Sequence, residues 1–174
     1  MPFPLLIFLT LQFLTTSNCS NIIFLNMFNS KSHALTMMPL AERLSDDGHN
    51  VSMYTISANR LRIPSKKVNI LESLVRMEGS TDDSAPDTSG VSRIFWNYEM
   101  TPYYGAWCYE IGLHYLDEGR DDQLKALLST PYDLAIVDET YSSLQGSIAL
   151  KLKENHGTKI IAFATTGMIN CLFE

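Results

Sequence analysis

The chain has 174 residues, of which 45% are hydrophobic and 18% charged, with a formal net charge of −6 and a pI near 5.1. A chain of this length and composition buries one good hydrophobic core, so we expect one folded domain. Its 13 Lys and Arg residues are scattered and form no basic stripe that could neutralise phosphates, which excludes a general nucleic-acid binder.

The first residues, MPFPLLIFLTLQFLTTSNCSN, combine an apolar run with small and polar residues. This layout is typical of a secretory signal peptide, which we predict over residues 1–19, and the run is short for a membrane-spanning helix. No Lys or Arg precedes the run, so a buried N-terminal strand or an uncleaved anchor is the alternative. The prediction assigns residues 20–174 to the mature domain.

The three cysteines, Cys19, Cys108 and Cys171, show neither CxxC spacing nor a metal-binding pattern, and we predict no metal site. Cys19 is expected to leave with the signal peptide. Cys108 and Cys171 either pair in an oxidising lumen or stay as buried free thiols, because spacing alone does not give their separation.

Two N-glycosylation sequons occur, NCS at Asn18 and NVS at Asn50. Asn18 lies in or beside the predicted signal peptide, and Asn50 stands at the start of a predicted strand. The sequence leaves open whether either asparagine carries a glycan.

Residues 21–28, NIIFLNMF, form a continuous apolar run typical of a strand that is covered on both faces. After the polar turn NSKS, apolar residues recur three positions apart and predict one face of a helix: Leu35, Met38, Ala41 and Leu44. Pro39 is expected in the first helical turn, where its missing N–H costs little. Gly48 is predicted to cap this helix in the left-handed conformation, and NVSMYTI begins the next strand. Strand, helix and strand together predict a parallel crossover unit.

The middle of the chain gives weaker signals. Residues 66–77 predict a third strand, or a strand that runs into a helix, and residues 78–90 are polar and predict a mobile surface loop. Residues 91–118 are rich in aromatic and aliphatic side chains and predict helices broken near Pro102. We interpret this aromatic density as core packing, although an apolar acceptor pocket draws on the same residue types.

The last third of the chain repeats the alternation of strands and helices predicted for its first third. An amphipathic helix at residues 121–130 precedes a strand at 132–138, a helix at 142–157 with Ser142 or Ser143 at its cap and Gly157 past its end, and a strand at 159–167. Strands that alternate with helices predict an α/β fold with a parallel sheet. In such sheets ligands bind outside the carboxyl ends of the strands.

Two residues that suit acid–base chemistry are expected on that same edge: His33 follows the first strand and Asp138 ends a later one. A neutral imidazole can take a proton from a hydroxyl near pH 7, and a carboxylate on its other nitrogen fixes the tautomer and stabilises the imidazolium. The chain has no G-x-S-x-G elbow, which favours general-base activation of a substrate hydroxyl over covalent catalysis. The alternatives are a structural or capping role for His33 and a helix N-cap role for Asp138.

Other titratable residues are weaker candidates. His49 is interpreted as a turn residue, His114 as part of a helical aromatic segment, and His156 as a helix-end residue. Strand alternation directs Asp133 away from Asp138. The first turn, NSKSH, lacks the G-x-G-x-x-G phosphate loop, so we do not expect it to hold a nucleotide.

At these residues the chain resembles a known family. IIFLNMFNSKSHALTMMPLAERLSDDGHNVSMYT is similar to the start of the animal UDP-glucuronosyltransferases, in which a strand leads to a Ser-His pair and then to a helix that ends in Gly-His. CYEIGLHYLDEGRDDQLKALLSTPYDLAIVDETYSSLQGSIALKL is similar to a later block that opens on a Cys, here Cys108, and ends in the second catalytic residue. The amino acids present in both blocks suggest an invertebrate member of this family.

The resemblance implies a Rossmann-like, N-terminal domain of a GT-B glycosyltransferase. It implies transfer of glucuronic acid or glucose from a UDP-sugar co-substrate to a hydroxyl of a small lipophilic acceptor, with inversion and with no further cofactor. His33 is then the catalytic base and Asp138 its carboxylate partner. The family's location implies the lumen or membrane of the endoplasmic reticulum, with membrane association and a possible oligomer.

No donor-binding motif follows in this sequence, so the resemblance implies the acceptor-binding half, with the C-terminal donor domain absent. A second hypothesis is a non-catalytic lumenal protein that binds an apolar ligand or regulates full-length transferases. An in-frame continuation of the gene into a donor domain would favour the enzyme.

Overall fold

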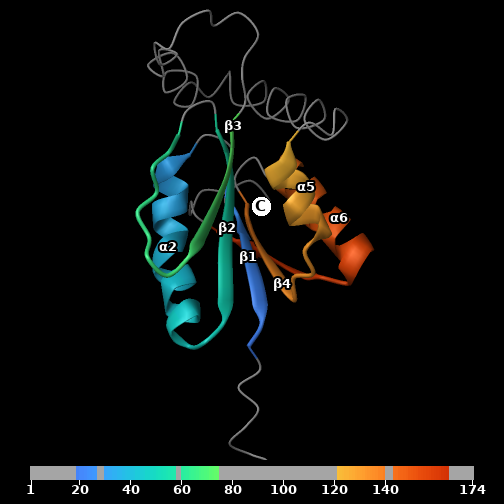
Figure 1. The fold of residues 1–174 in the computed structure, drawn as a ribbon, viewed down its shortest axis with the longest axis horizontal. Coiled ribbons are helices and arrows are strands. Elements are labelled where there is room, and N and C mark those ends of the chain that lie inside the picture. The colour runs from blue at the N-terminus through green and yellow to red at the C-terminus, as the bar shows by residue number, and fades with distance from the viewer. Residues whose placement is uncertain (1–18, 27–29, 58–59, 75–120, 140–142, 165–174) are drawn as a thin grey trace, which may run out of the picture.

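The computed structural model describes residues 19–26, 30–57, 60–74, 121–139 and 143–164. In chain order its elements are β1 (Asn21–Leu25), α2 (Lys31–Asp46), β2 (Asn50–Ser57), β3 (Asn69–Leu74), α5 (Asp122–Ser129), β4 (Leu134–Asp138), α6 (Ser143–His156) and β5 (Lys159–Phe163) (Figure 1). The predictions for residues 1–18, 78–90 and 91–118 lie outside the described residues, as do Cys108, His114 and Cys171.

All five strands run parallel, in the order β3-β2-β1-β4-β5. Parallel neighbours cannot be joined by a tight turn, so α2 connects β1 to β2 and α6 connects β4 to β5. The fold is therefore α/β and Rossmann-like, as the sequence predicts. Strand order reverses between β1 and β4, and this switch point is where parallel sheets of this class bind ligands.

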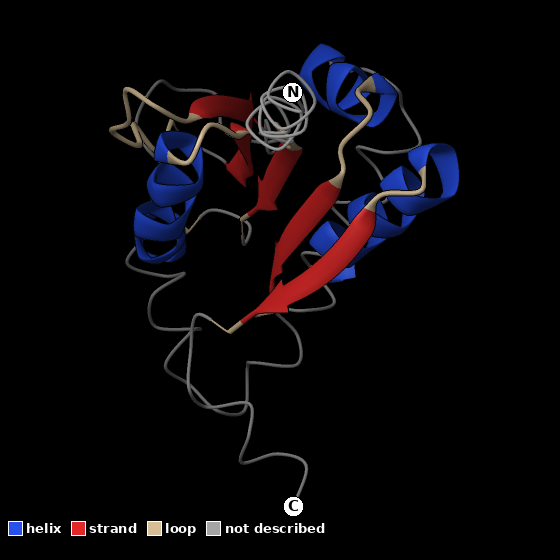
Figure 2. Ribbon diagram, turned by 90° about the horizontal axis from the view of Figure 1, so that it is seen from below, coloured by secondary structure: helices blue, strands red, loops and turns tan. Residues whose placement is uncertain are grey.

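Alternating residues of the central strand β1 supply two hydrophobic cores, one on each face of the sheet. Ile22 and Phe24 pack in the cluster that contains the buried side of α2, whereas Ile23 and Leu25 pack in the cluster formed with α5 and α6. Helices consequently lie on both sides of the strands (Figures 1 and 2). The apolar run at residues 21–25 is thus a strand buried on both faces, as predicted.

Helix α2 is defined by capping groups at both ends. Ser30 is the N-cap, and its hydroxyl accepts a hydrogen bond from the backbone N–H of His33. At the other end Gly48 has φ of 93°, and the N–H groups of Gly48 and His49 donate to the carbonyls of Ser45 and Leu44. This is the Schellman arrangement, which confirms Gly48 as the left-handed residue that ends the helix.

Two details of α2 differ from the prediction. Pro39 lies in the interior of the helix and not in its first turn, because the helix begins at Lys31. The buried face consists of Ala34, Met37, Met38 and Ala41, while Leu35 is 43% exposed. Residues three apart advance by about 300° around a helix, so the predicted stripe spreads over about half of the surface, and the sheet covers a narrower sector.

Strands β1, β3 and β5 can also be compared with the predictions from the sequence. The first strand ends at Leu25 and not at residue 28. A strand is present at Asn69–Leu74, within the predicted range 66–77, and the choice between a strand alone and a strand that runs into a helix falls on residues outside the described part of the chain. Edge strand β5 is the most exposed of the five, with Ile161 at 53%. No helix within the described ranges combines the length and apolarity needed to cross a bilayer.

Candidate active site

His33 and Asp138 meet at the carboxyl edge of the sheet. β1 and β4 are direct neighbours, with Leu25 in register with Val137, so the residues that follow β1 and end β4 lie close together. Asp138 is the last residue of β4, and His33 is the third residue of α2. His33 Nδ1 lies 2.8 Å from Asp138 Oδ2. The two predicted residues are therefore in hydrogen-bond contact at the topological switch point.

The environment of this pair defines its chemistry. The Asp138 side chain is fully buried, and that of His33 is 12% exposed, so the imidazole keeps an accessible edge while the carboxylate does not. A carboxylate only accepts hydrogen bonds, which places the proton of a neutral His33 on Nδ1. In that tautomer Nε2 carries a lone pair and can accept a proton. The arrangement is an imidazole held and oriented by a buried carboxylate, which can support acid–base chemistry.

The position of Asp138 bears on the helix-cap alternative. An N-cap residue directly precedes the first residue of its helix, and α6 begins at Ser143, five positions after Asp138. Asp138 instead lies within strand β4, in register with Phe163 of β5. One oxygen of its carboxylate, Oδ2, contacts His33.

Hydrogen bonds made by Asn26 and Gln145 connect the turn before His33 to helix α6, and the sequence analysis did not predict them. Gln145 Nε2 donates to the backbone carbonyl of Asn26 at 2.9 Å, and Asn26 Nδ2 donates to the carbonyl of Ser30 at 2.8 Å. Ser30 in turn caps the helix turn that carries His33. The only sequence signal was one Asn inside the apolar run IIFLNMF.

Several buried oxygen atoms at this edge have no hydrogen-bond partner among the described residues. They are Oδ1 of Asn26, Oε1 of Gln145, Oε1 of Glu139 and Oγ1 of Thr55. Asn26 follows β1 and Glu139 follows β4, so two of these acceptors flank the switch point. Buried polar atoms are almost always paired in native proteins, so acceptors of this kind suit a ligand that brings hydrogen-bond donors, such as hydroxyl groups.

The other titratable candidates lie at or near the opposite edge of the sheet, where the strands begin. His49 Nδ1 accepts from the backbone N–H of Ser20, and Asp133 accepts from the N–H of Asn21 at 2.8 Å. His156 Nε2 donates to a backbone carbonyl at the end of α5. These contacts are structural, so none of the three joins the His33 pair. Within the described ranges no cluster of three or more His, Cys, Asp or Glu side chains is placed to hold a metal ion.

Comparisons with known proteins give similarity in fold only. No protein-family model matches the chain, and no curated protein sequence matches it. Among solved structures, the chain is similar to TcCGT1 in complex with UDP, with 13% identity and a TM-score of 0.47 over 86% of this chain and 29% of that one. It is also similar to CalG4, the calicheamicin glycosyltransferase, with 11% identity and a TM-score of 0.43 over 89% of this chain and 36% of that one.

A third match is the C-terminal domain of PF1911 hydrogenase from Pyrococcus furiosus, with 11% identity and a TM-score of 0.47 over 82% of this chain and 90% of that domain. The chain thus spans about a third of the length of TcCGT1 and CalG4, at 29% and 36%. With TM-scores below 0.5, and with a hydrogenase domain beside the glycosyltransferases, these likenesses carry no functional argument.

Proposed function

We propose that this chain is the acceptor-binding, N-terminal domain of a GT-B UDP-glycosyltransferase of the glucuronosyltransferase type. The observation that carries the proposal is the 2.8 Å contact between His33 Nδ1 and the buried Asp138 carboxylate at the switch point of a parallel sheet. This geometry suits removal of a proton from a hydroxyl group. The sequence resemblance assigns the same two residues the same roles.

In the proposed reaction, His33 Nε2 takes the proton of an acceptor hydroxyl as its oxygen attacks the anomeric carbon of the UDP-sugar. The new bond joins that carbon to the acceptor oxygen, the bond to the UDP oxygen breaks, and UDP leaves with the electron pair. A single in-line displacement inverts the anomeric centre. Asp138 stabilises the imidazolium that forms, and general-base assistance of this kind contributes on the order of 10²- to 10⁴-fold.

The partners follow from the same proposal. The acceptor is a small lipophilic molecule with a hydroxyl group, and the donor is UDP-glucuronic acid or UDP-glucose held by a second, C-terminal domain. Residues 1–19 direct the chain to the secretory pathway, where the full-length enzyme is membrane-associated. Asn26 and Gln145 hold the turn before His33 in place through their hydrogen bonds to the chain.

The proposal is tested by joining the full chain to the donor domain of a UDP-glycosyltransferase and measuring transfer of labelled sugar to simple phenols. His33→Ala is expected to lower kcat by about 10²- to 10⁴-fold with little change in the KM for the acceptor. His156→Gln is the matched control, because this histidine lies at the end of α6, away from His33, and its ring hydrogen-bonds to a backbone carbonyl. A His33→Ala protein with the full rate would exclude His33 as the base.

A second measurement keeps the proposal testable if the joined protein is inactive. Binding of phenols to the chain alone is followed through the NMR signals of the imidazole of His33. Perturbation of those signals is expected for an acceptor site at the switch point, and the His33→Ala variant, which lacks them, identifies which imidazole signals belong to His33. Binding that leaves the imidazole signals unchanged would place the ligand elsewhere and favour a non-catalytic binding protein.

A further inference from the structure

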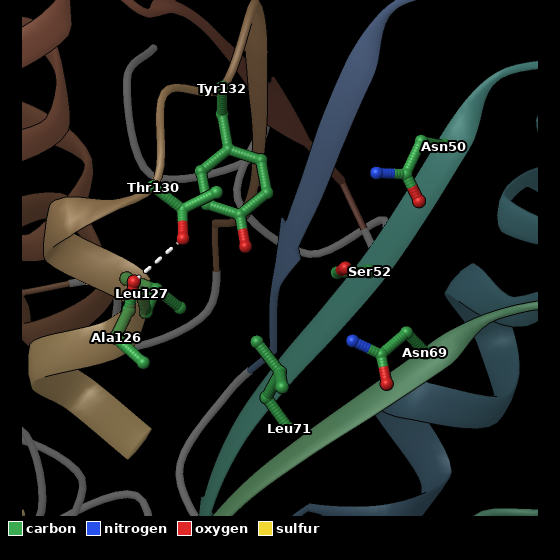
Figure 3. Close-up of a pocket in the computed structure, with 8 residues that line it drawn as sticks. All are labelled: Asn50, Ser52, Asn69, Leu71, Ala126, Leu127, Thr130 and Tyr132. Carbon is green, nitrogen blue, oxygen red and sulfur yellow. Dashed lines mark hydrogen bonds between the residues drawn. The ribbon is translucent and has the colours of Figure 1, made fainter. Parts of the chain in front are cut away.

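A polar pocket lies at the opposite edge of the sheet from His33. Its volume is about 220 Å³, and it lies between the first residues of β2 and β3 and the end of α5 (Figure 3). The residues that line it are Asn50, Ser52, Asn69, Leu71, Ala126, Leu127, Thr130 and Tyr132. The proposed function uses none of these residues, so the pocket needs a separate explanation.

The chemistry of this pocket suits a neutral, hydroxyl-rich molecule. None of its lining residues is charged, and its polar groups are hydroxyls and side-chain amides. Tyr132 is 7% and Ser52 6% exposed, so both hydroxyls belong to the buried part of the wall. Burial raises the pKa of Tyr132, which keeps its hydroxyl protonated and able to donate as well as accept. Amide and hydroxyl groups beside the apolar Leu71 match the mixed polar and apolar faces of a sugar ring.

Two of the lining residues, Asn50 and Ser52, are also the first and third residues of the sequon NVS. Asn50 is exposed at the start of β2, and one N–H of its side chain donates to Asn21 Oδ1 at 2.9 Å. Its side-chain nitrogen points to the side of β2 on which Tyr132 lies (Figure 3). An N-linked asparagine retains one N–H, which can still donate to Asn21 when it is the hydrogen on that side of the amide.

We propose that Asn50 carries an N-linked glycan and that the first sugar of this glycan lies in the adjoining pocket. In the modification, the side-chain nitrogen loses a proton and bonds to the anomeric carbon of a sugar on a lipid pyrophosphate donor, and the lipid pyrophosphate leaves. The transfer occurs on the unfolded chain as it enters the secretory pathway, so this inference rests on the secretory location proposed above.

Cell-free translation of the full chain with microsomes tests the attachment. The protease-protected product is expected to show one glycosidase-sensitive increase in mass, which Asn50→Gln and Ser52→Ala abolish. Ser52→Thr keeps the sequon and Asn18→Gln removes the other one, so both controls should retain the increase. A protected but unmodified chain overturns this inference alone. A chain that stays outside the microsomes overturns the secretory location as well.

The position of the first sugar is tested with the purified glycoprotein. An endoglycosidase that leaves one N-acetylglucosamine on Asn50 is expected to leave Tm unchanged, whereas complete enzymatic removal, which converts the asparagine to aspartate, should lower it by roughly 2–4 °C. The directly expressed Asn50→Asp variant is the matched control for that product. Asn69→Ala, on the neighbouring strand β3, should shrink the difference. Equal Tm values for the one-sugar and sugar-free forms would overturn the placement in the pocket.

Discussion

Replacement of His33 by alanine removes one hydrogen-bond donor from a carboxylate that is fully buried. The contact is 2.8 Å long, Asp138 is 0% exposed and His33 only 12%, so solvent hardly screens the interaction. A hydrogen bond to a charged group contributes about 1.5–3 kcal/mol, and we expect His33→Ala to lower the free energy of unfolding by this amount. The corresponding decrease in Tm is roughly 3–12 °C for a chain of this size.

A double-mutant cycle isolates the pair from the other contacts of each residue. Urea unfolding of the full chain is measured for wild type, His33→Ala, Asp138→Ala and the double variant. In the Asp138→Ala background, His33→Ala is expected to cost less than about 0.5 kcal/mol, because the partner is already absent. An equal cost of His33→Ala in both backgrounds would refute a coupled pair and would leave His33 as an ordinary helix residue.

The surface pair of Lys67 and Asp46 provides the matched control. Its shortest contact is 2.7 Å, about the same length, but the two side chains are 50% and 52% exposed. The hydrogen bond and charge of Asp46 raise the pKa of Lys67, so the pair does interact. Because water screens exposed ion pairs, a cycle on these two residues should give a coupling too small to resolve. A comparable coupling in both cycles would show that burial is not what strengthens the His33 contact.

Three further predictions concern single residues. Pro39→Ala restores an amide in the interior of α2 and should stabilise the protein by on the order of 1–3 kcal/mol in urea unfolding; an unchanged midpoint would contradict this reading. Gly157 has φ of 74°, and Gly157→Ala should destabilise by about 1–2 kcal/mol although a Cβ meets nothing, as differential scanning calorimetry can check. Burial raises the pKa of Tyr132 above 10.0, so its stabilising effect is present below that pH and is lost as the pH rises further; Tyr132→Phe should weaken this loss in alkaline unfolding curves.

The fold could be predicted from short sequence patterns because the local sequence preference of most elements agrees with the structure they form. Uninterrupted apolar runs such as residues 21–25 are typical of strands buried on both faces, and glycines at positions 48 and 157 mark the helix ends, where the structure has positive φ. Parallel strands share one carboxyl edge, so the approach of His33 to Asp138 followed from topology. Its chemical role stays a prediction.

The errors concern features that the neighbouring sheet decides. Whether Leu35 or Ala34 is buried depends on how α2 is rotated against the strands, and a spacing of three residues does not fix that rotation. Pro39 was misplaced because the helix starts two turns earlier, at the Ser30 cap. The bond between Gln145 and Asn26 joins residues 119 positions apart, and no local pattern signals it.

The separation of His33 and Asp138 along the chain affects which changes in sequence length such a protein can tolerate. The two residues are 105 positions apart, yet β1 and β4 pair directly and fix their geometry. Closure entropy grows slowly with loop length, by about 0.6 kcal/mol for each doubling. Because β1 and β4 pair directly, the geometry of the pair does not depend on a fixed length of chain between the two residues. Under the proposed function, the two catalytic positions can therefore be retained in chains whose intervening segments differ in length.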